Sequence, residues 1–235
     1  MADTSSDPLL LLPGLMTDAR LWWHQIAHLS TGRMLQVAHL GSGDTVGEMA
    51  LTVLDDAPQR FALAGHWLGA VVALEILERA PDRVSRIALL DINPFPEGAQ
   101  TAVEREARMV RARSGRLAEV VMDEVPEAAL APGETNLTAR AMLLDMAEAQ
   151  GAERYVTQAR ALMRRPDYHK TLRATRIPSL VLCGAADTVC PVRRHELLAD
   201  LMPGGQFLKI EGAGHLPTLE QPEAVTAALA DWLTS

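Results

Sequence analysis

The sequence predicts an α/β fold with a mostly parallel sheet of about six strands and helices on both faces. Apolar runs of four to six residues recur along the chain, as in strands buried on both faces. Longer amphipathic stretches separate these runs, and this alternation implies parallel strands joined by crossover helices. A third observation is a segment without a convincing strand, residues 97–175, between the fourth and fifth runs.

The predicted strands are bounded by residues that interrupt regular structure. Pro13-Gly14 follows the first run, Gly65 the third and Gly184 the fifth. The six predicted strands are Leu9–Leu12, Leu35–Leu40, Phe61–Ala64, Arg86–Leu90, Ser179–Cys183 and Gln206–Ile210.

The helices predicted between the strands have apolar residues three and four positions apart. Asp18 is placed to cap the first of them, and Pro191 to begin the fourth. The five predicted helices of the core are Ala19–Leu29, Thr45–Ala57, Leu68–Ala80, Pro191–Leu201 and Pro222–Leu233.

The strand-free segment predicts an all-helical insertion. Its helical patterns are Glu104–Arg113, Leu117–Val125, Ala139–Ala149 and Arg154–Arg164. Open α/β sheets bind ligands at the carboxyl ends of their strands, so helices inserted there predict a lid. We therefore expect a core of residues 1–96 and 176–235 and a helical cap of residues 97–175.

Composition limits the possible partners and compartments. A length of 235 residues suits one α/β domain with an insertion, and a net charge of −8 argues against nucleic-acid and anionic-membrane partners. No apolar run approaches the roughly 18 residues of a membrane span, and the N-terminus lacks the features of a signal peptide. With Cys183 and Cys190 its two cysteines, the chain is expected to be cytoplasmic with reduced thiols.

The segment after the third predicted strand carries the most specific motif. It reads Gly65-His66-Trp67-Leu68-Gly69, at a strand–turn–helix boundary. This resembles the G-x-S-x-G elbow of the α/β-hydrolase family, in which two glycines let the chain turn sharply. Tryptophan occupies the middle position, where the family has its nucleophilic serine.

Three further segments extend the resemblance over nearly the whole chain, in the family's order. The family's first core strand and oxyanion loop are similar to Leu10 to Trp22. Its strand end with the triad acid is similar to Val181 to Asp187, and its loop with the triad histidine is similar to Glu211 to His215. The chain most resembles small bacterial esterase-like members. The resemblance implies Asp187 and His215 as acid and base, with oxyanion donors at the backbone N–H groups of Leu15 and Leu68.

Trp67 is the decisive position for activity. Indole has only an N–H donor and cannot attack an acyl carbon as a serine hydroxyl does. Its bulk also takes space that a substrate needs. Loss of the nucleophile in a comparable serine hydrolase costs about 10⁶ in turnover.

Other residues could fill the same roles. Asp91 ends the fourth predicted strand and is the rival acid, whereas Cys190 and Ser42 are minor candidates for a nucleophile. His66 is expected to be a packed, hydrogen-bonded histidine and Cys183 a buried strand residue. No metal-ligand spacing, phosphate loop or dinucleotide motif appears, so no metal or cofactor is expected.

Three functions fit these observations. The first is a carboxylesterase-like hydrolase of small acyl esters, impaired by Trp67. The second is a nucleophile-independent enzyme, of lyase or proton-transfer type, in which His215 acts on water or on a substrate proton. The third is a binding protein for a small apolar ligand. The sequence does not indicate an oligomeric state.

Overall fold

The computed structural model describes residues 7–235. Its strands are β1 (Leu9–Leu12), β2 (Leu35–Val37), β3 (Phe61–His66), β4 (Val84–Leu90), β5 (Ser179–Gly184) and β6 (Gly205–Ile210). Its α-helices are α1 (Trp23–Leu29), α2 (Val46–Asp56), α3 (Leu68–Arg79), α4 (Ala99–Arg113), α5 (Leu117–Glu124), α6 (Glu134–Gln150), α7 (Ala152–Met163), α8 (His169–Ala174), α9 (Val192–Leu201), α10 (Pro217–Glu220) and α11 (Pro222–Thr234). Short 3-10 turns lie at Ala19–Trp22, Pro81–Arg83 and Glu127–Ala129.

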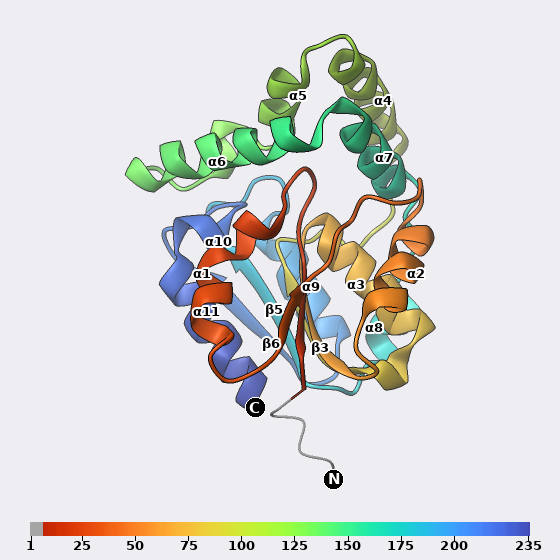
Figure 1. The fold of residues 1–235 in the computed structure, drawn as a ribbon, viewed down its shortest axis with the longest axis vertical. Coiled ribbons are helices and arrows are strands. Elements are labelled where there is room, and N and C mark those ends of the chain that lie inside the picture. The colour runs from red at the N-terminus through yellow and green to blue at the C-terminus, as the bar shows by residue number, and fades with distance from the viewer. Residues whose placement is uncertain (1–6) are drawn as a thin grey trace.

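The six strands form one parallel sheet in the order β2-β1-β3-β4-β5-β6. Helices α1 and α11 cover one face of the sheet, and α2, α3 and α8 lie on the other side (Figure 1). The predicted parallel sheet with helices on both faces is confirmed. Because all strands run the same way, their carboxyl ends meet at one edge.

Burial follows the position of each strand in the sheet. Every residue of β1, β3, β4 and β5 is buried, whereas β2 and β6 are edge strands with partly exposed residues. Strand β2 ends at Val37, three residues before the predicted end, because its neighbour β1 stops at Leu12. The last backbone bond in this direction runs from Ala38 N–H to Leu11 O (2.9 Å).

Side-chain caps set two helix starts. Asp18 accepts a hydrogen bond from Arg20 N–H at the first 3-10 turn. Thr45 forms a capping box with Glu48, and α2 therefore begins at Val46.

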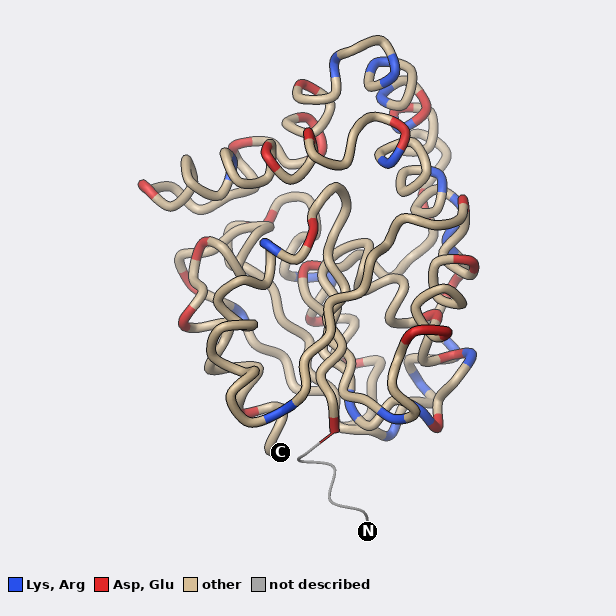
Figure 2. Tube along the Cα trace, viewed as in Figure 1, with Lys and Arg blue, Asp and Glu red and all other residues tan. Residues whose placement is uncertain are grey.

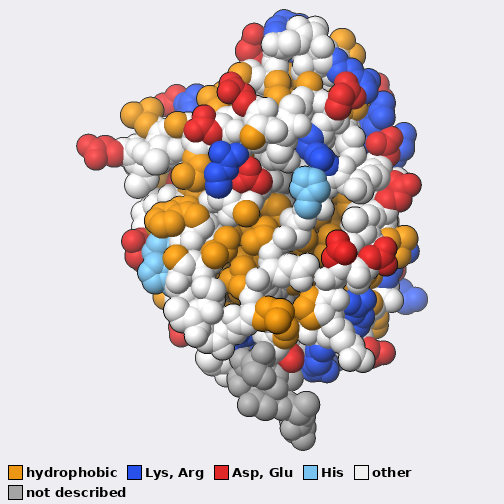
Figure 3. Space-filling view, viewed as in Figure 1, with side chains coloured by type: hydrophobic (Ala, Val, Ile, Leu, Met, Phe, Trp, Pro, Cys, Tyr) orange, Lys and Arg blue, Asp and Glu red, His pale blue; other side chains and the backbone are white. Residues whose placement is uncertain are grey.

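Residues 91–178, all of which are described, contain helices but no strand. Helices α4, α5, α6 and α7 lie beyond the carboxyl edge of the sheet, at the top of Figure 1. Acidic and basic residues are interspersed along these inserted helices (Figure 2), whereas hydrophobic side chains gather below them on the face that Figure 3 presents. In the described residues, no helix has the length and apolar character needed to cross a membrane.

Candidate functional site

The turn between β3 and α3 brings Trp67 to the carboxyl edge of the sheet. Trp67 has φ 45° and ψ −107°, a left-handed conformation that is rare for a bulky residue and costs about 1–3 kcal/mol. A Cβ at Gly65 would lie 2.5 Å from Gly69 O, and one at Gly69 would lie 2.3 Å from Leu12 O. Gly65 therefore lets the start of α3 approach the end of β3, and Gly69 lets it approach the end of β1.

Gly14 and His66 pack together behind this turn. A Cβ at Gly14 would lie 2.4 Å from His66 Nδ1, so this loop also needs glycine. His66 Nε2–H donates to His215 O at 2.7 Å, and the ring is fully buried. Burial, followed by repulsion from His215, lowers the pKa of His66 to about 3. His66 is therefore the packed, hydrogen-bonded histidine that the sequence predicts, and it holds the loop of His215.

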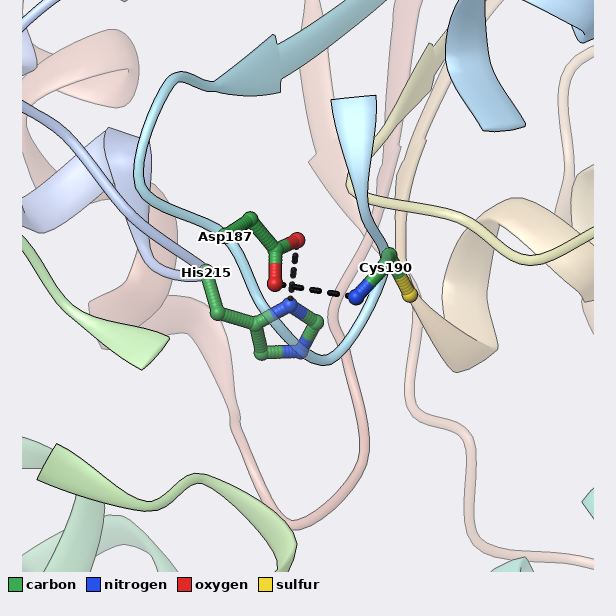
Figure 4. A group of neighbouring side chains, drawn as sticks. All are labelled: Asp187, Cys190 and His215. Atoms are coloured by element: carbon green, nitrogen blue, oxygen red, sulfur yellow. Dashed lines mark hydrogen bonds and ion pairs between the residues drawn. The ribbon is translucent and has the colours of Figure 1, made fainter. Parts of the chain in front are cut away.

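Asp187 and His215 lie in direct contact after β5 and β6. His215 Nδ1–H donates to Asp187 Oδ2 at 2.9 Å, and Asp187 Oδ1 accepts from the backbone N–H groups of Val189 (2.8 Å) and Cys190 (2.9 Å). Figure 4 shows the carboxylate between the imidazole and the Cys190 backbone nitrogen. Burial raises the pKa of Asp187, but the charge and hydrogen bond of His215 outweigh it and leave this pKa below its usual range.

Asp91 lies beside Asp187 but does not bond His215. It has φ 46° at the end of β4, and its Oδ1 accepts from Gly184 N–H at 3.0 Å, which ties β4 to β5. Its Oδ2 is 4.0 Å from His66 Nε2, and no hydrogen bond joins Asp91 to His215 among the described residues. Burial and the nearby Asp187 raise the pKa of Asp91 well above its usual range.

The indole of Trp67 packs against the imidazole of His215. Their ring centroids are 4.6 Å apart and their planes are nearly perpendicular, at 85°. Both side chains are buried, and His215 Nε2 has no hydrogen-bond partner within the described chain. An imidazole held in this tautomer presents an unprotonated Nε2, which is the atom a general base uses.

The two predicted oxyanion donors lie in buried backbone. Leu68 is the first residue of α3, so its N–H precedes the intrahelical bonds and lies at the positive end of the helix dipole. Leu15 is followed by Met16 (φ 55°), whose N–H donates to Gln158 Oε1 at 2.8 Å. Gln158 Nε2–H donates in turn to Leu40 O at 2.9 Å, so α7 ties together two loops at the sheet edge.

Trp67 borders two cavities. One is an apolar void of about 10 Å³, bordered by an acid, Glu124, and by Leu15, Met16, Trp67, Val121, Val125, Leu143 and Tyr155. The other is a polar cleft of about 600 Å³ between the inserted helices and the β5–α9 loop, with Trp67 and Cys190 in its wall. The indole thus occupies space between an almost filled apolar site and an open polar one.

The alternative nucleophiles are poorly placed. Burial and the nearby Asp187 raise the pKa of the Cys190 thiol well above its usual range, which disfavours the reactive thiolate. Ser42 is exposed and does not line the cleft. Cys183 is buried in β5, as predicted, and burial raises its pKa as well.

A metal ion could in principle be held by Asp187, Cys190 and His215, which lie close together. Their ligand atoms lie within 4.8 Å of one another. However, the proton on His215 Nδ1 already lies between His215 and Asp187. The Cys190 thiol, whose pKa is raised, is a poor metal ligand. The donor set suits a hydrogen-bonded pair better than a metal.

An ionic network in the inserted helices was not predicted. Arg105 donates to Glu97 (2.8 Å) and Glu124 (2.9 Å), and Arg165 donates to Glu97 (3.0 Å). Tyr155 Oη–H donates to Glu124 at 2.5 Å. All four ionic side chains are at most 6% exposed. Sequence spacing could not reveal them because their partners lie 8 to 68 positions apart.

Comparison with known proteins agrees with this architecture. The chain belongs to the alpha/beta hydrolase family, whose model matches residues 9–228. It is 26% identical to a pimeloyl-acyl-carrier-protein methyl ester esterase from Edwardsiella ictaluri, over 95% of this chain and 92% of the relative. A thermophilic esterase from Thermogutta terrifontis superposes with a TM-score of 0.87 and 26% identity, over 97% and 89% of the two chains. An enol-lactonase from Burkholderia xenovorans shares the fold, with a TM-score of 0.85 and 22% identity over 98% and 92%. Similarity to these esterases supports a hydrolase-type enzyme.

Proposed function

We propose that this chain is a carboxylesterase-like protein for small acyl esters whose hydrolytic activity is impaired at Trp67. The observation that carries the proposal is the 2.9 Å bond between His215 Nδ1 and Asp187, beside an unpartnered Nε2 that faces the Trp67 ring. In the proposal, His215 is the general base, Asp187 orients it, and Trp67 occupies the nucleophile position.

The remaining roles in the proposal follow from position. The backbone N–H groups of Leu15 and Leu68 are the oxyanion donors, and they need no particular side chain. The inserted helices of residues 97–175 act as a lid, since α4, α5 and α7 contribute the outer wall of the cleft and the core contributes the inner wall. A lid of this kind excludes water and sets the size of the substrate.

The test is hydrolysis of p-nitrophenyl acetate by the native chain and by Trp67→Ser. We expect little or no turnover by the native chain and a gain of at least about several hundredfold in the variant, because loss of a serine nucleophile costs about 10⁶. The variant also shortens a side chain that fills the site, so circular dichroism and thermal melting should accompany the kinetics.

Two control variants separate chemistry from space. Trp67→Ala opens the same volume without a hydroxyl, and we expect no gain from it. Adding His215→Ala to Trp67→Ser should remove the gain, because the hydroxyl then has no base. If the folded serine variant is as inert as the alanine variant, the assignment of the Asp187–His215 pair to ester cleavage is wrong.

A second candidate function is the binding of a small molecule without turnover. The cleft of about 600 Å³ beside a blocked centre favours it. In this case a ligand raises the thermal midpoint of the native chain while no product forms. Hydrolysis by the native chain that is lost in His215→Ala would instead favour the nucleophile-independent enzyme.

A further inference from the structure

The polar cleft has an uneven distribution of charge. Four arginines line it, namely Arg105, Arg108, Arg165 and Arg194. Four acidic residues do so as well, but Asp123 is paired with Arg111, which is outside the cleft, and Glu104 is exposed and bonded to Gln100. Glu104 keeps its charge because Gln100 is neutral, so the cleft sets four guanidinium groups against three carboxylates, Glu97, Glu104 and Glu124.

The arginines differ in how far these carboxylates satisfy them. Arg105 bonds both Glu97 and Glu124, and Arg108 lies 3.5 Å from Glu124. Arg165 is 4% exposed and uses Nε and Nη1 for its bonds to Phe95 O, Leu162 O and Glu97. Its Nη2 has no acceptor in the described residues, and burial lowers the pKa of this guanidinium despite Glu97.

Arg194 has no acidic partner within the described part of the chain. Its Nη1–H donates to the neutral Asn93 Oδ1 at a long 3.3 Å, and its guanidinium lies 5.6 Å from the centre of the Phe95 ring. It projects from the first turn of α9, on the opposite wall of the cleft from Arg108 on α4. The planar guanidinium has donors arranged to bind a carboxylate at two points.

We propose that this cleft binds the free carboxylate of a small half-ester or dicarboxylate, with Arg194 as the main contact and Arg108 and Arg165 supporting it. The other end of the ligand then lies against Trp67 and Cys190, which line the same cleft. The guanidinium of Arg194, which has no acidic partner in the described residues, gives the site its preference for an anion over a neutral ester. This proposal names the substrate class of the proposed hydrolase, and it rests on that function only in treating the bound molecule as a substrate.

The test is calorimetric titration of the full native chain with monomethyl adipate and dimethyl adipate, which differ in one free carboxylate. We expect the monomethyl ester to bind at least about tenfold more tightly, since a hydrogen bond to a charged group contributes enough for that ratio. Arg194→Gln should remove the difference, Arg194→Lys should restore part of it, and added salt should weaken it.

Arg193→Gln is the matched control, because Arg193 is adjacent, exposed and outside the cleft. It should bind both esters as the native chain does. Equal affinity for the two esters, no binding of either, or equal losses in the two glutamine variants would overturn the proposal. Because titration needs no turnover, these outcomes are independent of whether Trp67→Ser hydrolyses a neutral ester.

Discussion

The imidazole of His215 is held by a carboxylate on one side and bordered by an indole on the other. Its bond to Asp187 fixes the tautomer, and its Nε2 faces Trp67, which carries no hydroxyl proton to transfer. The left-handed backbone of Trp67 stores strain that a structural residue would not need. The strained turn thus places an indole, which offers no hydroxyl, beside the imidazole.

The buried histidines predict how stability depends on pH. Burial lowers the pKa of His66 to about 3 and that of His195 to about 4, against about 6.5 in an unfolded chain. Below pH 6.5 the unfolded chain therefore binds protons that the folded chain does not, and unfolding is favoured. Their contribution to stability is complete above pH 6.5 and falls as the pH drops toward 3, by about 1.4 kcal/mol per pH unit for each histidine.

Urea denaturation between pH 7 and pH 4.5 measures this slope. His66→Gln should make it shallower by about 1.4 kcal/mol per pH unit, because one of the two proton-binding groups is gone. His39→Gln is the control, since His39 is exposed, and it should keep the native slope. An unchanged slope in His66→Gln would show that His66 is protonated in the folded protein.

At the scale of elements, the spacing of apolar residues and the glycines and prolines that interrupt it predicted most of the fold. Strand β1 has its predicted bounds, and α3 differs by one residue at its C-terminus. Helices α4 and α6 were predicted less accurately, since they begin at Ala99 and Glu134 rather than at Glu104 and Ala139, where their first turns are mostly exposed, and the short helices α8 and α10 were not predicted. The candidate site residues were predicted from local features as well: Gly65 and Gly69 flank the turn between β3 and α3, and Asp187 and His215 lie in the loops after β5 and β6. The charged cleft was not, because it depends on how distant helices pack.

Two glycines in helices predict opposite effects of one substitution. Gly69→Ala places a Cβ 2.3 Å from Leu12 O and 2.5 Å from Pro13 O, both backbone atoms that cannot move freely. We expect a loss of about 1–3 kcal/mol, as for overpacking in a core. Gly47→Ala in α2 meets first the end of the Arg79 side chain, which can shift, so it should cost nothing and gain from helix propensity.

Guanidinium denaturation of both variants measures this difference. A loss in Gly69→Ala with none in Gly47→Ala supports close packing of the α3 start against the end of β1. Equal stabilities would mean that the turn before α3 has room for a methyl group, and the tight elbow would then not explain the two glycines.

At the scale of the whole molecule, a few charged residues join the insertion to itself and to the core. Glu97 lies before α4 and Arg165 after α7, and Arg105 bonds both Glu97 and Glu124 of α5. Elsewhere α7 reaches the core through Gln158, and Glu220 Oε1 accepts from Ala131 N–H at 2.6 Å. The inserted helices and the sheet edge should therefore lose their arrangement together when this network is broken.

Arg105→Met tests this coupling. The variant keeps an apolar side chain but removes the guanidinium. Glu124 then loses one buried partner, and Glu97 keeps only Arg165. We therefore expect a loss of about 3–5 kcal/mol in the free energy of unfolding. Arg113→Met, on the same helix as Arg105, removes an exposed ion pair with Glu153 of α7 and should leave the free energy of unfolding nearly unchanged. Urea unfolding followed by Trp67 fluorescence, in chains whose other tryptophans are replaced by phenylalanine, reports on the site itself. Similar small losses in both variants would mean that the network contributes little, and that apolar packing alone holds the inserted helices over the sheet edge.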